Sequence, residues 1–151
     1  MVEEGDKAPD FRLRGSDGKL HTLKDFKGKY LILYFYPKDN TPGCTLEANE
    51  FNKNLDDIRK FGAEIVGISK DDLNSHDKFR DKYKLHFLLL ADPESKVIKS
   101  YDAYGNRGVF GMGTLRNTYI IDGEGTVVKV FKKVNPKGHA NEVMNFLRNS
   151  R

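Results

Sequence analysis

The sequence has a single cysteine, Cys44, among its 151 residues. One cysteine cannot close a disulfide within the chain, so a disulfide-stabilised scaffold is excluded. No stretch approaches the roughly 18 consecutive apolar residues that a membrane-spanning helix needs. The first residues, 1–6, are acidic and polar, which is unlike a secretory signal peptide. These absences predict a cytoplasmic location, where thiols stay reduced, and no membrane partner.

The chain also lacks a large excess of charge of either sign, since its formal net charge is +4. Basic and acidic residues alternate over 53–60 and 71–84, which is typical of a solvated surface. Lysines at 129, 132, 133 and 137 form a basic cluster, but no nucleic-acid-binding motif accompanies it. The four histidines lack metal-ligand spacing. We therefore expect no nucleic-acid partner, no metal and no organic cofactor.

The apolar pattern predicts one domain over residues 1–151 with alternating strands and helices. Strands are expected at 11–14, 19–21, 30–36, 63–69, 87–91, 116–121 and 126–134. Helices are expected from about Pro42 through Ile58 and at 72–84, 94–101 and 138–149. Glycine-rich residues 102–114 are predicted to be a loop, whose Phe110 and Met112 either cover a site or form a subunit contact.

The order of these elements is βαβ followed by ββα, after an initial hairpin. Parallel strands need helical crossovers, which the spacing of the first half supplies. The second half supplies antiparallel strands. The order predicts an α/β protein with a thioredoxin-like fold: a mixed central sheet flanked by helices, with an N-terminal β-hairpin extension.

The lone cysteine falls where a buried strand gives way to a helix. Thr41 is a plausible N-cap, and Pro42 suits the first helical position. Counting four residues back from Ala48 places Cys44 on the inward face of the first turn. The free N–H groups and the positive dipole end of a helix favour the nucleophilic thiolate. A lone cysteine is most often a small buried hydrophobe, but this setting favours chemistry over packing.

Thioredoxin-fold oxidoreductases carry Cys-x-x-Cys at the same turn, where this chain reads Thr41-Pro42-Gly43-Cys44. Threonine replaces the first cysteine, so dithiol exchange within the motif is impossible. A hydroxyl beside a thiolate is suited instead to holding a small oxygen-containing substrate.

These residues resemble a known signature. Pro37-x-x-x-Thr41-x-x-Cys44 is similar to the signature of the peroxiredoxins. The string over 37–48 resembles the peroxiredoxin Q, or bacterioferritin comigratory protein, branch, and so do residues 5–11 and 116–122. The three motifs lie in the right order and span nearly the whole chain.

The resemblance implies a thiol-dependent peroxidase that reduces hydrogen peroxide and small alkyl hydroperoxides. Cys44 would attack a peroxide oxygen and become a sulfenic acid. Arg116 would favour the thiolate and stabilise the negative charge that develops on the leaving oxygen. Thr41 would hydrogen-bond the peroxide, although its hydroxyl could also serve only as a helix cap.

Three further residues are implied as supports of the site. Pro37 would shape the pocket and shield the thiolate from water, besides ending the strand. Gly43 would contribute a backbone N–H to the substrate. Glu47, one turn past the cysteine, is a candidate to orient Arg116 by a paired hydrogen bond, or is simply an acid favoured by the helix dipole.

The sequence departs from the branch at position 49. Many members have a resolving cysteine five residues after the first, or one in the next helix, but this chain has Asn49 and no cysteine in 72–84. The resemblance is therefore to a one-cysteine form, monomer or weak homodimer, reduced by an external thiol: thioredoxin, glutaredoxin, glutathione or another small thiol.

Other outcomes stay open at this stage. Two chains could be linked through Cys44. A peroxide sensor that forms mixed disulfides with a partner, without sustained turnover, is the alternative to an enzyme. A purely structural module gives no reason for Thr41, Cys44 and Arg116 together.

Overall fold

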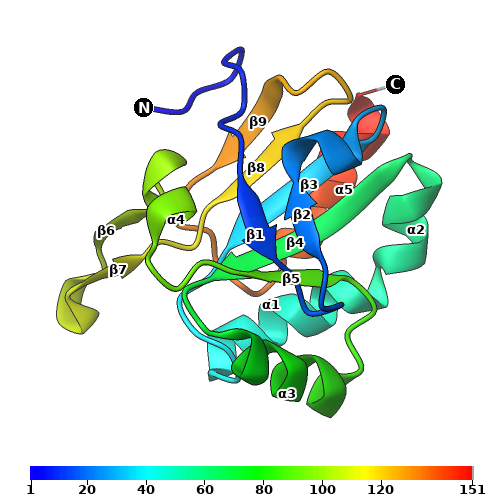
Figure 1. Cartoon of the computed structure of the whole chain (residues 1–151). Coiled ribbons are helices and arrows are strands. Elements are labelled where there is room, and N and C mark those ends of the chain that lie inside the picture. The colour runs from blue at the N-terminus through cyan, green and yellow to red at the C-terminus, as the bar shows by residue number, and fades with distance from the viewer. Residues whose placement is uncertain (151) are drawn as a thin grey trace.

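A computed structural model describes residues 1–150, and a five-stranded sheet runs through its centre (Figure 1). The strand order is β5-β4-β3-β8-β9. Strands β3, β4 and β5 are parallel, whereas β8 pairs antiparallel with both β3 and β9. Their bounds are β3 (Tyr30–Phe35), β4 (Ala63–Ser69), β5 (Leu88–Ala91), β8 (Thr118–Ile121) and β9 (Val127–Phe131). The predicted mixed α/β sheet is confirmed.

The central strand β3 is buried on both faces, which explains its unbroken apolar sequence. Successive side chains of a strand point to opposite faces. Ile32 and Tyr34 accordingly join one hydrophobic cluster, while Leu31, Leu33 and Phe35 join the other.

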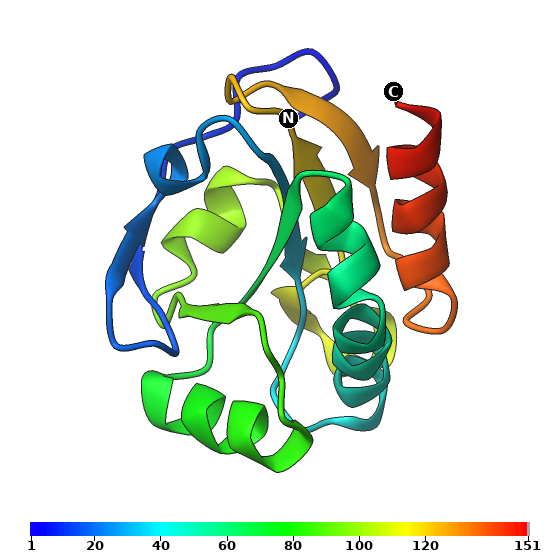
Figure 2. The same ribbon diagram turned by 90° about the vertical axis from the view of Figure 1, so that its right-hand side faces the viewer.

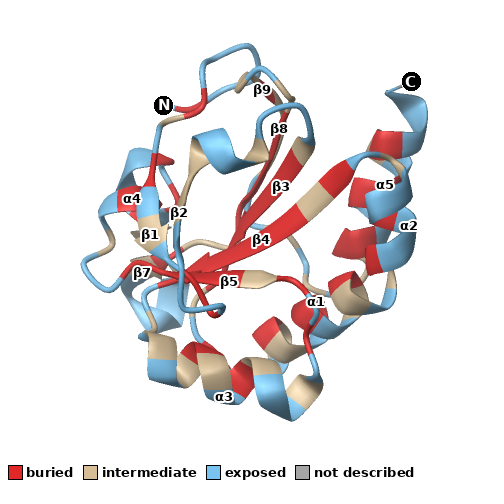
Figure 3. Ribbon diagram, turned by 45° about the vertical axis from the view of Figure 1, so that its right-hand side comes forward, coloured by how far each residue is buried: buried red, intermediate tan, exposed pale blue. Residues whose placement is uncertain are grey.

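Each cluster is covered by its own set of elements (Figures 2 and 3). The first packs under α1 (Pro42–Lys53), α2 (Leu55–Lys60), α3 (Leu73–Tyr83) and α5 (His139–Asn149). The second packs under α4 (Lys96–Ser100) and residues of the N-terminal segment, with Leu13 and Leu23 against it. That segment contains the predicted hairpin, β1 (Arg12–Arg14) and β2 (Leu20–Thr22), followed by the 3-10 turn η1 (Leu23–Phe26).

The single helix expected from about Pro42 through Ile58 is in fact two helices, interrupted at Asn54. Asn54 has φ −98° and ψ 6°, and its side-chain amide donates to the Glu50 carbonyl at 2.8 Å. Asparagine competes in this way with the helical backbone. Leu55 and Ile58 remain buried beyond the break, so the apolar periodicity continues across it.

The prediction of a loop for the glycine-rich segment 102–114 is also wrong in detail. It forms a hairpin arm from β6 (Tyr104–Asn106), the 3-10 turn η2 (Gly108–Phe110) and β7 (Met112–Thr114), which extends from the body of the molecule (Figure 1). Gly111, with φ +73°, supplies the left-handed conformation of the turn. Glycines within the short strands hid them from propensity arguments.

None of the helices formed by residues 1–150 is long and apolar enough to cross a membrane.

Candidate active site

Cys44 lies in the first turn of α1, just beyond the carboxyl end of β3, and is only 1% exposed. The Thr45 N–H donates to the Thr41 carbonyl at 2.8 Å, which is the first hydrogen bond of the helix. The N–H groups of Gly43 and Cys44 precede it and have no intrahelical acceptor. Cys44 thus lies at the N-terminus of α1, where backbone N–H groups are left without helical partners.

Thr41 occupies the N-cap position, but its side chain does not cap α1. Its Oγ1 instead donates to the Lys38 carbonyl at 2.8 Å, which closes the turn between β3 and α1. The capping expected of the hydroxyl is therefore wrong. Since the hydroxyl proton is already used, the oxygen's lone pairs are left to accept a hydrogen bond.

Arg116 lies on the connection between β7 and β8, two residues before β8. Its guanidinium contacts both Cys44 and Glu47. Its Nη1 donates to Cys44 Sγ at 3.4 Å and to Glu47 Oε1 at 2.9 Å. Burial disfavours the charged guanidinium, but Cys44 and Glu47 outweigh it and raise the pKa of Arg116. The strand expected to begin at Arg116 begins at Thr118, so the guanidinium sits on the connection rather than in the sheet.

Gly43 lets that guanidinium approach the helix. A Cβ at this position would lie 3.1 Å from Arg116 Nη2, which is tighter than ordinary contact. Glycine therefore has a steric role here, in addition to the backbone donor expected from the sequence.

Glu47 is 1% exposed and makes a single hydrogen bond to Arg116, rather than the paired one expected. Its Oε2 has no partner within residues 1–150. Burial raises the pKa of Glu47 to about 7, against the opposing effect of Arg116. Glu47 and Cys44 therefore both contact the Arg116 guanidinium, and both contact the same nitrogen of it, Nη1.

Pro37 lies at the edge of an open hollow of about 430 Å³. Arg116, Leu115 and Phe110 also line this hollow, so the arm β6–β7 contributes an aromatic side chain beside Arg116. Phe110 is 73% exposed. Phe110 and Met112 are expected either to cover the site or to form a subunit contact. The position of Phe110 fits the first expectation, whereas Met112 does not line the hollow.

Sequence reasoning missed Tyr34 as a polar group near the site. Its hydroxyl is fully buried and has no partner among the described residues. Burial, together with the negative charges of Glu47 and Cys44, raises the pKa of Tyr34 well above its ordinary value. The only signal in the sequence was a hydroxyl within an otherwise apolar strand.

Metal ligands do not gather in the part of the chain that the structure describes. No group of three histidine, cysteine, aspartate or glutamate side chains there could hold an ion. The buried histidines instead contact protein groups, as His139 does with Thr118 Oγ1 at 2.7 Å.

Comparisons with known proteins identify the family of this chain. The AhpC/TSA family profile matches residues 4–130. Peroxiredoxin Bcp of Bacillus subtilis (strain 168) is 43% identical over 150 residues, which cover 97% of this chain and 96% of the relative. A cysteine-to-serine variant of Xylella fastidiosa PrxQ superposes with a TM-score of 0.95 at 33% identity, covering 99% and 97% of the two chains. A structure of the Xanthomonas campestris bacterioferritin comigratory protein, which concerns its alkyl peroxide reduction activity, has a TM-score of 0.90 at 36% identity and covers 99% and 97%.

The chain belongs to the AhpC/TSA family of peroxiredoxins. Its relatives are named peroxiredoxin Bcp and peroxiredoxin Q, so the resemblance seen in the sequence is confirmed, and the protein is a thiol-dependent peroxidase.

Proposed function

We propose that Cys44 is the peroxidatic residue, reducing hydrogen peroxide and small alkyl hydroperoxides, and that an external thiol restores it. One observation supports this assignment: Arg116 Nη1 donates to Cys44 Sγ at 3.4 Å, and Cys44 lies in the first turn of α1, where backbone N–H groups have no helical acceptor. Both features stabilise negative charge, first on the thiolate and then on the leaving oxygen.

In the first step the Cys44 thiolate attacks the terminal, hydrogen-bearing oxygen of the hydroperoxide. A sulfur–oxygen bond forms as the O–O bond breaks, and the electron pair leaves with the second oxygen. That oxygen takes a proton and departs as water or an alcohol, and the sulfur is left as a sulfenic acid. The thiolate is thus oxidised by two electrons and the peroxide is reduced by two.

The neighbouring residues hold the peroxide for this attack. Thr41 Oγ1 accepts from the peroxide O–H, because its own proton is held by Lys38. The guanidinium of Arg116 and the N–H of Gly43 donate to the peroxide oxygens. Pro37 at the edge of the hollow limits water around the sulfur. Glu47 orients Arg116 through their hydrogen bond.

Organic hydroperoxides fit the hollow because Phe110 and Leu115 line it beside Arg116. An alkyl group can pack on these apolar side chains while the O–O group meets the charge. The alkyl peroxide reduction activity of the Xanthomonas campestris relative supports this choice.

The sulfenic acid of Cys44 is returned to the thiol by two external thiols. The first forms a mixed disulfide and releases water, and the second displaces Cys44 and leaves as a disulfide. Thioredoxin, glutaredoxin and glutathione have this chemistry. Because Cys44 is 1% exposed, the first turn of α1 must open before a thiol reaches the sulfur.

The setting of the reaction is part of the same proposal. The chain would act as one domain over residues 1–151, in the cytoplasm, with neither nucleic acid nor membrane as partner. It would be a monomer or weak homodimer. Val109, Phe110 and Met112 supply a small exposed apolar surface on the arm for such a weak contact.

Stopped-flow mixing with hydrogen peroxide and with tert-butyl hydroperoxide tests the assignment. We expect one equivalent of peroxide to be lost rapidly per Cys44, none with Cys44→Ser, and sustained loss when a thiol reductant is present. A wild-type reaction no faster than that of a free thiol would refute it. A single turnover that no thiol reductant extends would instead identify a sensor.

A further inference from the structure

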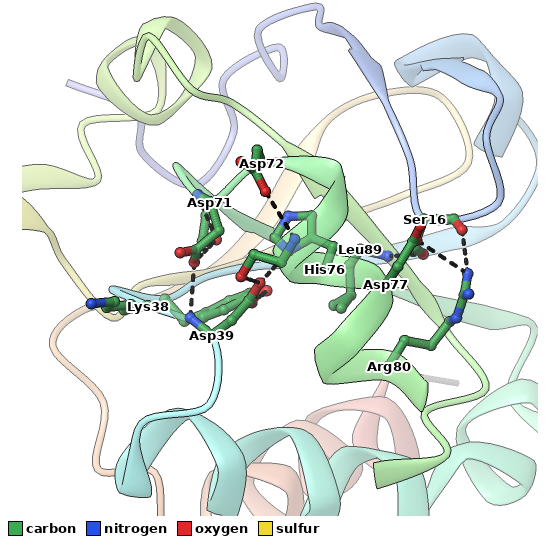
Figure 4. A network of polar contacts seen from close by, with 12 residues as sticks. Ser16, Lys38, Asp39, Asp71, Asp72, His76, Asp77, Arg80 and Leu89 are labelled. Atoms are coloured by element: carbon green, nitrogen blue, oxygen red, sulfur yellow. Dashed lines mark hydrogen bonds and ion pairs between the residues drawn. The ribbon is translucent and has the colours of Figure 1, made fainter. Parts of the chain in front are cut away.

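Asp39, in the connection between β3 and α1, is the centre of a buried polar network (Figure 4). Its carboxylate accepts hydrogen bonds from the Tyr36 hydroxyl at 2.6 Å, Ser75 Oγ at 2.8 Å and His76 Nδ1 at 2.7 Å. Its backbone N–H donates to Asp71 Oδ2 at 2.8 Å. The residue is 6% exposed. Both its side chain and its backbone are therefore held by α3 and by the segment between β4 and α3.

His76 in α3 is fully buried, and both of its ring nitrogens face acceptors. Nδ1 lies against Asp39, and Nε2 lies 2.9 Å from the Leu90 carbonyl of β5. A ring that donates at both nitrogens is an imidazolium. Burial opposes this charge, but Asp39, the Leu90 carbonyl and Asp71 together raise the pKa of His76. Asp39, Asp71 and the Tyr36 phenol are the titratable groups that face it.

This network lies next to a left-handed piece of backbone. Asn40, the residue after Asp39, has φ +59°, a conformation that asparagine tolerates better than most other residues with a side chain. Thr41 follows directly, and α1 begins at the next residue. Asn40 Oδ1 accepts from the Tyr83 hydroxyl at 3.1 Å, so α3 contacts this turn both at Asn40 and, through His76, at the buried Asp39 one residue earlier.

We propose that Asp39 and His76 are positioning residues for the peroxidase reaction: this buried pair holds the connection between β3 and α1, and with it Thr41 and Cys44, in the arrangement that meets the peroxide. The proposal rests on the function proposed for Cys44. A buried ion pair is weak evidence for stability, because well-packed apolar residues often serve equally well. Placement of the turn gives the pair a purpose that packing does not.

Two substitutions of one residue separate the contact from the volume it fills. In His76→Asn the amide nitrogen takes the place of Nδ1 and still donates to Asp39. In His76→Gln it takes the place of Nε2 and donates to Leu90 instead. We expect Cys44 oxidation by peroxide to be slowed at least about tenfold in His76→Gln, and substantially less in His76→Asn. Urea unfolding of both variants measures their stability alongside.

Hydrogen exchange of the Thr45 amide, which donates to the Thr41 carbonyl, gives a readout that needs no peroxide chemistry. We expect it to be about tenfold faster in His76→Gln than in wild type, with His76→Asn between them. Unchanged exchange in His76→Gln would overturn the proposal, and so would equal effects in the two variants. If exchange responds as expected but wild type fails to consume peroxide, the positioning of the turn stands and the function of Cys44 falls.

Discussion

The buried Glu47 makes the stability of this protein depend on pH in a way that one substitution should remove. Its carboxyl group is 1% exposed, and one oxygen has no partner within residues 1–150. Burial raises its pKa from the ordinary 4.5 to about 7. Glu47→Gln keeps an acceptor for Arg116 but has no proton to lose.

The sign and size of the effect follow from linkage. Because the folded pKa lies above the unfolded one, the folded state holds the Glu47 proton more tightly. This stabilisation is complete below pH 4.5 and is lost as pH rises through 7. The difference between the two pKa values corresponds to about 3 kcal/mol in the free energy of unfolding, at about 1.4 kcal/mol per unit.

Urea unfolding of wild type and Glu47→Gln between pH 4 and pH 8 measures this loss. We expect the free energy of unfolding of Glu47→Gln to rise relative to wild type across the window, by up to about 3 kcal/mol. His76 and His139 titrate in both proteins, so their effects cancel in the difference. Parallel stability curves would show that Glu47 is not protonated in the folded protein near neutral pH, and would refute the reasoning.

Substitutions at three further residues probe the site. Arg116→Ala should slow Cys44 oxidation about 10²- to 10³-fold, as loss of a transition-state donor does. Arg116→Lys keeps the charge and should recover part of the rate, while an unchanged rate in Arg116→Ala would remove the arginine from the mechanism. Gly43→Ala places a Cβ 3.1 Å from Arg116 Nη2 and should slow peroxide consumption without a comparable loss of stability in urea; an unaffected rate would show that the guanidinium need not approach so closely. Phe110→Ala should lower kcat/KM for tert-butyl hydroperoxide more than for hydrogen peroxide, and equal losses for both would contradict the role of the arm in holding the alkyl group.

Local patterns in the sequence predicted most of the sheet. The second central strand, 63–69, matches β4 residue for residue, because a parallel strand buried on both faces is mostly apolar, and Glu64 is its one charged residue. The inward placement of Cys44 followed from helical periodicity. The arm at 104–114 escaped notice, since its short strands contain glycines that favour loops.

Contacts between distant segments account for the rest. Asp39 and His76 are 37 residues apart, and the sequence around each residue contains no pattern that predicts their pairing. Arg116 was placed at the site by resemblance, not by spacing. The sharing of its Nη1 between Cys44 and Glu47 depends on how the connection before β8 packs against α1.

The burial of Cys44 hinders its reduction by an external thiol. Asn49 is exposed on α1, while Cys44 on the same helix is buried. A thiol at that position would meet the sulfur only after the helix unwound. The external thiol proposed above likewise reaches Cys44 only once the first turn of α1 opens, so the contacts that hold this turn oppose the reduction of the sulfur.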